Sequence, residues 1–331
     1  MYASPAVAGD TLFVGSCSGY CYALNKNTGD LIWKKYLGGL SFHGNPLVVD
    51  SMLLIPSDGS SGALNALALS NGTKLWQQQF PGNDNVRGGM RTDLTCFHET
   101  VMGVSTLDVL IGLDVTSGTR LWEFASIRRP DRDYRNVAPV LHDSVVFFAG
   151  FDGWLYCIDP VDGGVSWKSN IGARPTTSLA LHEDHLYIGA ADSTLCKLSA
   201  RNGTVIVRLE LEARPRMRLS LAGSMLILLC ESFCELYGTR RLMGVDLEHM
   251  EIAWDLPVSV DSRWTVKKAP RYERWIVAGN AQGEILMLQP ETGHIEKTFK
   301  VAGRVRSITF DNEVMHVGTI EGHIQAVRII R

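Results

Sequence analysis

The stretch GLDVTSGTRLW, residues 112–122, decides the fold of this chain. Four other segments repeat its pattern of a short apolar run, a polar turn and a second run that ends in tryptophan, and two more keep the spacing without the tryptophan. The copies recur about every 40 to 47 residues, a period at which one repeat forms a four-stranded propeller blade. The other tryptophan copies are ALNKNTGDLIW (23–33), ALALSNGTKLW (66–76), CIDPVDGGVSW (157–167) and GVDLEHMEIAW (244–254), and the degenerate copies are KLSARNGTVIV (197–207) and MLQPETGHIEK (287–297).

The first repeat predicts four short antiparallel strands joined by tight turns. Its turns contain glycine, which tolerates positive φ, and Asn or Thr, whose side chains cap the turn. The strands are apolar on both faces, so the sheet must be covered on both sides, which radial stacking of similar sheets achieves. The predicted strands span residues 3–7, 11–16, 20–24 and 31–35.

The later repeats continue this pattern through the rest of the chain. An eighth repeat contains predicted strands at 307–310, 313–318 and 323–328 and lacks a fourth. We predict an all-β propeller of four-stranded antiparallel blades with eight blades, and seven blades as the alternative count. Either the last blade is one strand short, or residues upstream of Met1 supply the missing strand. The intermediate repeats span 46–76, 94–122, 139–167, 178–207, 219–254 and 270–297.

Composition favours one globular unit. The 331 residues are 45% hydrophobic, which suffices for a large core, and no apolar run approaches membrane-spanning length. No linker or composition shift interrupts residues 1–331, so we predict a single domain. The net charge of −3 argues against a general nucleic-acid binder. No secretory signal follows Met1, which favours a cytoplasmic location for the sequence as given, whereas removal of a signal would leave a periplasmic or extracytoplasmic location open.

Cysteine and histidine give no clear chemistry. Cys17 and Cys21 flank a Ser-Gly hairpin signal, so a disulfide is one option, but reduced, half-buried thiols are favoured, and the same holds for Cys230 and Cys234. Four of the nine histidines lie at or beside predicted turns, which disfavours a shared metal site. No nucleophile elbow, phosphate-binding loop or zinc-type spacing occurs. The turn histidines are His98, His142, His182 and His185.

The recurring tryptophan has a structural explanation. An indole on the last strand of a blade can lie across the neighbouring blade and stack on its backbone near the small turn residues. This burial requires no chemical role. We therefore predict structural docking roles for Trp33, Trp76, Trp122, Trp167 and Trp254.

The pattern A-x-D-x-x-T/S-G-x-x-x-W resembles the tryptophan-docking repeat of the pyrroloquinoline-quinone (PQQ) propeller family over residues 3–331. This resemblance implies the fold but does not decide the function. The family includes quinoprotein dehydrogenases, which bind the quinone with calcium, and non-catalytic relatives such as the BamB-like lipoprotein scaffolds of bacterial outer-membrane assembly.

The enzymatic branch of that family carries an adjacent cysteine pair, a calcium-ligating acid and a catalytic aspartate. This sequence contains no adjacent cysteines. Its nearest acidic cluster is Asp131-Arg132-Asp133, where the arginines make a poor cation cage. The resemblance therefore favours the non-catalytic BamB-like branch, with no cofactor.

Positive charge gathers in the connections between the last strand of one blade and the first strand of the next. In a propeller this places the basic residues near one mouth of the central channel, where converging arginines can bind carboxylate or phosphate groups. Alternatively, they pair with Asp84, Asp93, Asp131, Asp133 and Asp261 in solvated networks. The predicted anion- or partner-binding residues are Arg87, Arg91, Arg135, Arg174, Arg216, Arg218, Lys267, Arg304 and Arg306, and the connections also hold His43, Arg128, Arg129, Arg132, Arg214, Arg263 and Lys268.

These observations predict a non-catalytic, monomeric binding scaffold that uses its arginine-rich face. A protein partner would dock an acidic loop there or add a strand to the open edge of the last blade. The competing hypothesis is a sensor of a small anion or quinone, or a PQQ-dependent oxidoreductase-like enzyme, that uses the central channel. We predict no catalytic, cofactor-binding or metal-binding residue, no nucleic-acid partner and no transmembrane segment.

Overall fold

The structure is a computed structural model that describes residues 3–38, 41–59, 62–83, 86–126, 137–231, 240–258, 265–268 and 275–328. Throughout these ranges the regular elements are all β-strands. None of the described residues forms a helix long and apolar enough to cross a membrane. Contacts divide the chain into two compact units, Met1–Lys168 (unit 1) and Ser169–Arg331 (unit 2). The single domain predicted for 1–331 stays a prediction.

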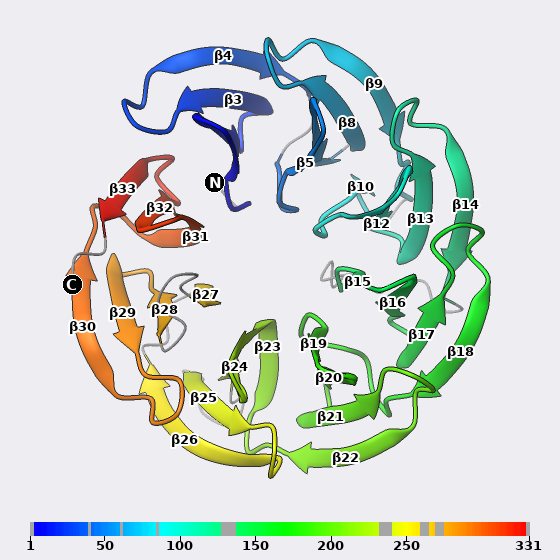
Figure 1. Ribbon diagram of the computed structural model, residues 1–331, viewed down its shortest axis with the longest axis vertical. Coiled ribbons are helices and arrows are strands. Elements are labelled where there is room, and N and C mark those ends of the chain that lie inside the picture. The colour runs from blue at the N-terminus through cyan, green and yellow to red at the C-terminus, as the bar shows by residue number, and fades with distance from the viewer. Residues whose placement is uncertain are drawn as a thin grey trace. The chain divides into compact units, whose positions relative to one another are not determined.

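Unit 1 contains four four-stranded antiparallel sheets, or blades, and one two-stranded ribbon. In each blade the strands pair in chain order, apart from the ribbon strand inserted in blade 2 (Figure 1). Blade 1 comprises β1 (Ala6–Ala8), β2 (Thr11–Gly15), β3 (Tyr20–Asn25) and β4 (Leu31–Tyr36); blade 2 comprises β5 (Leu47–Val49), β6 (Met52–Pro56), β8 (Ala63–Ala68) and β9 (Lys74–Gln79); the ribbon is β7 (Asp58–Gly59) with β10 (Gly88–Gly89). Blade 3 comprises β11 (Thr95–Phe97), β12 (Thr100–Val104), β13 (Val109–Asp114) and β14 (Arg120–Ala125), and blade 4 comprises β15 (Val140–His142), β16 (Val145–Ala149), β17 (Trp154–Ile158) and β18 (Val165–Asn170).

Unit 2 contains three four-stranded blades and one three-stranded blade. Blade 5 comprises β19 (Ala180–His182), β20 (His185–Gly189), β21 (Thr194–Ser199) and β22 (Val205–Glu210), and blade 6 comprises β23 (Arg214–Ala222), β24 (Met225–Glu231), β25 (Arg240–Asp246) and β26 (Glu251–Val258). Blade 7 comprises β27 (Thr265–Lys268), β28 (Ile276–Gly279), β29 (Glu284–Leu288) and β30 (Ile295–Lys300), and blade 8 comprises β31 (Val305–Asp311), β32 (Val314–Thr319) and β33 (Ile324–Arg328).

The fold is an all-β propeller with eight blades, so the predicted count is confirmed and the alternative of seven is wrong. Through residue 328 the eighth blade has the three strands that the sequence predicts. The first strand begins later than predicted, at Ala6. The reason is that the Ser4 backbone N–H donates to the Asn45 side chain at 2.7 Å, outside any strand ladder.

Within each unit the first strands of successive blades contact one another, as β1 contacts β5, β11 contacts β15 and β23 contacts β27. The apolar faces of neighbouring blades form shared cores. One such core joins Phe13 and Trp33 of blade 1 to Leu53 and Ile55 of blade 2. Because a strand directs alternate side chains to opposite faces, each blade contributes to a core on either side.

Four of the predicted docking tryptophans bond to the next blade of the same unit. The Trp122 indole N–H donates to the Pro160 carbonyl at 3.0 Å. A Cβ on Gly163, whose φ is +76°, would lie 2.8 Å from the indole, so the ring rests directly on this turn. Trp122 also faces Gly112 on its own blade. The equivalent hydrogen bonds run from Trp33 to Leu69, from Trp76 to Val115 and from Trp254 to Pro290. For Trp167 the structure gives a contact with Phe147 of the same blade, with ring centroids 5.7 Å apart.

The joint between blades 5 and 6 lacks the indole and is built differently. Val207 stands at the tryptophan position, and Lys197 is its partner on the adjacent strand. The Lys197 Nζ donates to the Leu247 carbonyl at 3.1 Å, the acceptor position that indoles use elsewhere. Met250 replaces the turn glycine at φ +55° and is buried in the same core. Three changes at one joint thus compensate for the missing ring.

The cysteine pair does not form the disulfide considered from the sequence. Cys17 and Cys21 are free, and they are exposed and buried respectively rather than both half-buried. Burial raises the pKa of the Cys21 thiol to about 12. Cys230 is also free and buried, whereas Cys234 lies outside the described residues.

Candidate functional site

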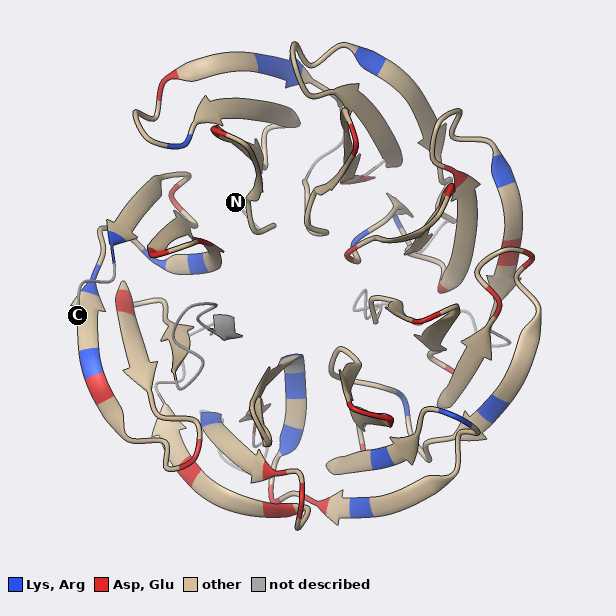
Figure 2. Cartoon of the chain, in the orientation of Figure 1, with Lys and Arg blue, Asp and Glu red and all other residues tan. Residues whose placement is uncertain are grey.

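The predicted basic residues differ in the exposure of their side chains. Arg91, Arg216 and Arg304 form ion pairs with acids that the sequence analysis did not name as partners. Arg87 and Arg218 are exposed, and Arg174 and Arg306 are half-buried. Only the backbone of Lys267 is described, in β27, and Arg135 lies outside the described residues. Arginines recur along the first part of β23, as the blue bands in Figure 2 show.

The ribbon of β7 and β10 positions the best-defined site, in unit 1. A Cβ on Gly89 would lie 2.2 Å from the Ser57 carbonyl oxygen, and the φ of Gly89 is +107°. Only glycine permits this approach of the two backbones. On the other side, the Asp58 N–H donates to the Ser41 carbonyl at 3.1 Å. Asp58 is therefore fixed between the connection that leads into blade 2 and the connection that leads into blade 3.

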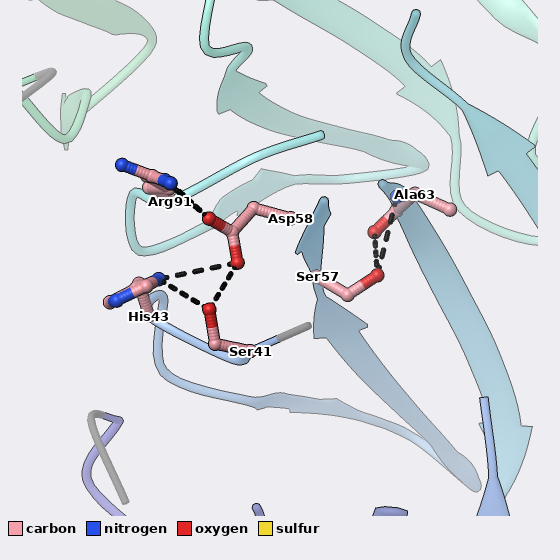
Figure 3. Close-up of polar contacts among 6 residues, drawn as sticks. All are labelled: Ser41, His43, Ser57, Asp58, Ala63 and Arg91. Carbon is pink, nitrogen blue, oxygen red and sulfur yellow. Dashed lines mark hydrogen bonds and ion pairs between the residues drawn. The ribbon is translucent and has the colours of Figure 1, made fainter. Parts of the chain in front are cut away.

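Four side chains meet at this position, and we call them the Asp58 cluster: Ser41, His43, Asp58 and Arg91 (Figure 3). The Ser41 hydroxyl donates to Asp58 Oδ1 at 2.6 Å, and His43 Nδ1 lies 3.3 Å from the same oxygen. Arg91 Nε donates to Asp58 Oδ2 at 2.5 Å, and Nη2 of Arg91 contacts the same oxygen. The carboxylate is thereby bonded on both oxygens.

Electrostatics in the cluster favour an ionised Asp58. Its side chain is 1% exposed, so burial alone would raise the pKa. The hydrogen bonds from His43 and Ser41 and the charges of His43 and Arg91 outweigh burial and hold the pKa of Asp58 below its ordinary value of 3.8. The side chains of His43 and Arg91 remain 28% and 19% exposed. The cluster therefore has its acid inside and its bases toward solvent.

A second charged cluster lies in blade 6 of unit 2, at the end of the sheet where β24 ends and β25 begins. Glu231 Oε2 lies 3.1 Å from Arg216 Nε, and Glu231 Oε1 lies 2.7 Å from Arg240 Nη2. The side chains are 10% exposed for Arg216, 19% for Glu231 and 22% for Arg240. Here the acid bridges two arginines, and the first of them is the most buried member.

A third pair is exposed. Arg304 Nε donates to Glu321 Oε1 at 2.9 Å, and the Arg304 backbone N–H donates to Oε2 at 2.9 Å. The hydrogen bond from the Arg304 side chain is the main reason that the pKa of Glu321 is lowered to about 2. This exposed pair contributes little stability, because solvent screens it.

The acids of these clusters share a position that sequence reasoning missed. Glu231 ends the second strand of its blade, and Asp58 and Glu321 lie two residues after the second strands β6 and β32. Of the acids considered from the sequence, Asp93 accepts hydrogen bonds from Asn45 at 2.9 and 3.2 Å. The other four, Asp84, Asp131, Asp133 and Asp261, lie outside the described residues.

The residues present do not fit a PQQ and calcium site. The sequence has no adjacent cysteine pair. Across the described ranges, no three His, Cys, Asp or Glu side chains gather closely enough to hold a metal ion. The acids of the charged clusters are instead engaged by arginines.

The chain is similar in sequence to outer membrane protein assembly factors and to a tetrathionate hydrolase. BamB of Alkalilimnicola ehrlichii is 26% identical over 208 residues, which are 59% of this chain and 50% of that protein. BamB of Legionella pneumophila is 26% identical over 190 residues, 56% of this chain and 47% of that protein. Tetrathionate hydrolase of Acidithiobacillus ferrooxidans is 23% identical over 199 residues, 53% of this chain and 38% of that protein. The chain thus spans about half the length, or less, of these curated relatives.

Solved structures show the same fold. BamB from Moraxella catarrhalis has a TM-score of 0.78 at 18% identity and is covered over 94% of its chain, with 99% of this chain matched. Quinohemoprotein alcohol dehydrogenase from Comamonas testosteroni has a TM-score of 0.75 at 11% identity, covering 96% of this chain and 70% of that chain. The model of the outer membrane protein assembly factor BamB family matches residues 2–151 and 106–327. With nearly its whole length matched, the chain belongs to the BamB family of PQQ-like propeller proteins.

Proposed function

We propose that this protein is a non-catalytic scaffold that binds a protein partner through the basic side chains leading into its first strands. Membership of the BamB family carries the proposal. The matched relatives from Alkalilimnicola ehrlichii and Legionella pneumophila are named as outer membrane protein assembly factors. A role in assembling outer-membrane proteins is therefore the process that we propose for this chain.

The basic side chains support an acidic partner. Arg87 and Arg218 are exposed, and His43 and Arg91 reach solvent while a buried acid holds them in place. Side chains held this way lose little freedom when a partner binds. Because several predicted arginines are already paired within the protein, we expect a few defined contacts rather than a broad positive field.

A second binding mode uses the edge of blade 8. Among the described residues the sheet order of blade 8 is β31-β32-β33, so β33 is the last strand of that sheet, whereas in each of the other seven blades the third strand pairs with a fourth. Residues of β33 are half-buried or exposed along its whole length. An extended segment of a partner can extend such a sheet by main-chain hydrogen bonds.

Binding to a labelled peptide tests the acidic mode. The probe is a fluorescein-labelled dodecapeptide that alternates Glu and Ser, and its control carries Gln in place of Glu. We expect fluorescence anisotropy to show binding of the Glu peptide alone, weakening as salt rises from 50 to 300 mM, because exposed charges are screened. Equal binding of both peptides, or of neither, would contradict the acidic mode.

One observation favours a second candidate function, an enzyme or sensor of a small anion. Tetrathionate hydrolase is among the matched relatives, and its name describes a protein that acts on an anion. A thermal-shift series with PQQ plus calcium, nucleotides, sugar phosphates and tetrathionate separates the two candidates. Stabilisation that is lost in an Arg174→Ala/Arg306→Ala variant would favour the small-anion function. An unchanged denaturation temperature with every ligand would favour the scaffold function.

A further inference from the structure

The Asp58 cluster orders its charges from the inside outward. Asp58 is 1% exposed, whereas His43 and Arg91 are 28% and 19% exposed at the side-chain level. The acid therefore fixes the two bases without itself meeting a ligand. The acids of the other two clusters are less deeply buried. The side chain of Glu231 is 19% exposed, and that of Glu321 is 35% exposed.

The contacts to Asp58 use one side of each base. Arg91 turns the edge formed by Nε and Nη2 toward Asp58, and His43 turns Nδ1 toward Asp58 and Ser41. The outer nitrogens of both side chains point to the same side, away from Asp58 (Figure 3). A guanidinium carries five N–H donors in a planar fork, so its outer edge can donate while its inner edge is held.

This arrangement suits a singly charged, planar acceptor. A carboxylate can take one charge-assisted hydrogen bond from the outer edge of Arg91 and, when both ring nitrogens of His43 carry protons, another from the imidazole. Arg91 and Asp58 together are neutral, so a doubly charged phosphate gains less here than at a cluster of unpaired arginines. The geometry therefore selects for hydrogen bonding rather than for high ligand charge.

We propose that His43 and Arg91, held by Asp58, form a binding site for an Asp or Glu side chain of the protein partner. The inference rests on the proposed function and names its point of contact. Partial exposure of both bases places the site where a side chain on a partner's surface can reach it. Exposed Arg87 lies just before β10, which leads to Arg91, and would contact residues beside the bound carboxylate.

The test measures how tightly the Glu-Ser dodecapeptide binds to variants of this chain, by fluorescence anisotropy. Arg91→Lys keeps the charge but loses the fork, and we expect affinity to fall about tenfold, the effect of one charge-assisted bond. We expect His43→Gln to lower it about threefold to tenfold. Arg120→Gln is the matched control, because this arginine lies on the fourth strand β14, pairs with the exposed Glu123 and belongs to no connection into a first strand, so its affinity should equal that of the unmodified protein.

Asp58→Asn gives the sharpest result, because two explanations predict opposite signs. Loss of a negative charge would strengthen binding if the site acted only by its net field. We expect weaker binding instead, about fivefold or more, because Arg91 and His43 lose the group that orients them. Stronger binding would overturn the proposal, and Ser41→Ala, which removes one hydrogen bond to Asp58, should weaken binding in the same direction but less.

The outcomes separate this site from the proposed function. If the unmodified protein binds the Glu peptide and Arg91→Lys and His43→Gln bind it equally well, the site is wrong while the scaffold function stands. If free succinate competes as well as the peptide at equal carboxylate concentration, the ligand is a small molecule, and the proposed protein contact is overturned. If the unmodified protein does not bind the Glu peptide, the proposed site and the acidic mode of binding both fail.

Discussion

Two joints between neighbouring blades use different hydrogen-bond donors. In unit 1 the joint between blades 3 and 4 is a buried indole, with Trp122 resting on Gly163 and donating to the Pro160 carbonyl. In unit 2 the joint between blades 5 and 6 uses the Lys197 ammonium and the Leu247 carbonyl. The backbone acceptor is retained while the donor changes from an aromatic N–H to a charged amine.

Residues at three sequence positions together determine which kind of joint forms. Trp122 faces Gly112 across its own sheet and Gly163 on the next blade, and each glycine leaves room for the ring. Where Val207 replaces tryptophan, Lys197 and Met250 occupy the corresponding two positions. At the Trp122 joint both neighbouring positions are glycine, whereas at the Val207 joint they are occupied by larger side chains.

The largest expected effect is at the indole joint. Trp122→Ala should lower the free energy of unfolding by about 3 to 5 kcal/mol, because it removes a buried aromatic side chain and leaves a cavity. Urea denaturation followed by circular dichroism measures the change, with Val207→Ala as the matched variant in unit 2. A loss below about 1 kcal/mol would show that the indole does not hold the two blades together.

The charged clusters extend the comparison. Asp58→Asn should lower the free energy of unfolding by about 3 kcal/mol at pH 7, because Arg91 loses its buried partner. The pKa of Asp58 is lowered in the folded state, so this stability is present above the ordinary value of 3.8 and is lost as pH falls through the folded-state value. The difference between variant and unmodified protein should therefore shrink in acid. Glu321→Gln, at the exposed pair, should change the free energy of unfolding little at any pH. Equal effects of Asp58→Asn and Glu321→Gln would contradict the expected difference between the buried and the exposed cluster.

The composition of the joint can be tested by converting one type into the other. Val207→Trp alone should destabilise by about 1 to 3 kcal/mol, since Lys197 and Met250 occupy the space of the ring. Adding Lys197→Ala and Met250→Gly should restore stability to within about 1 kcal/mol of the unmodified protein. Thermal denaturation of all single, double and triple variants gives the coupling energy, and strictly additive effects would show that the three positions are independent.

The smallest effect is expected at the polar joint itself. Lys197→Met retains the length of the side chain and removes the hydrogen bond to Leu247, so we expect a loss of about 1 kcal/mol. Equilibrium urea denaturation measures it, with Lys297→Met in blade 7 as a control on an exposed lysine. No loss would mean that packing by Met250 alone maintains this joint.

Repeat spacing predicted the blades because every copy carries its own turn and strand signals. The eight-blade count, the three strands of blade 8 and the positions of most strands follow from local patterns such as Asn-Gly turns followed by apolar runs. The start of β1 was misplaced because Asn45, 41 residues away, binds the Ser4 backbone. Local propensity contains no information on such a contact.

The charged clusters were predicted only in part for the same reason. The arginines recur just before first strands, so sequence spacing located Arg91, Arg216 and Arg304. Their acids come from a different connection, as Asp58 lies 33 residues before Arg91. Strand pairing brings these residues together, and spacing along the chain alone does not indicate Asp58, Glu231 or Glu321 as partners.

Blades 2 and 3 each carry one half of two different joints, a tryptophan donor on the fourth strand and an acceptor carbonyl in the turn between the third and fourth strands. Such a contact runs head to tail, so any copy of a blade can follow any other. Gene duplication of one repeat would therefore produce a neighbour that is already complementary to its parent. Val207 shows that one joint can lack the tryptophan while the next joint along the chain, between blades 6 and 7, keeps it.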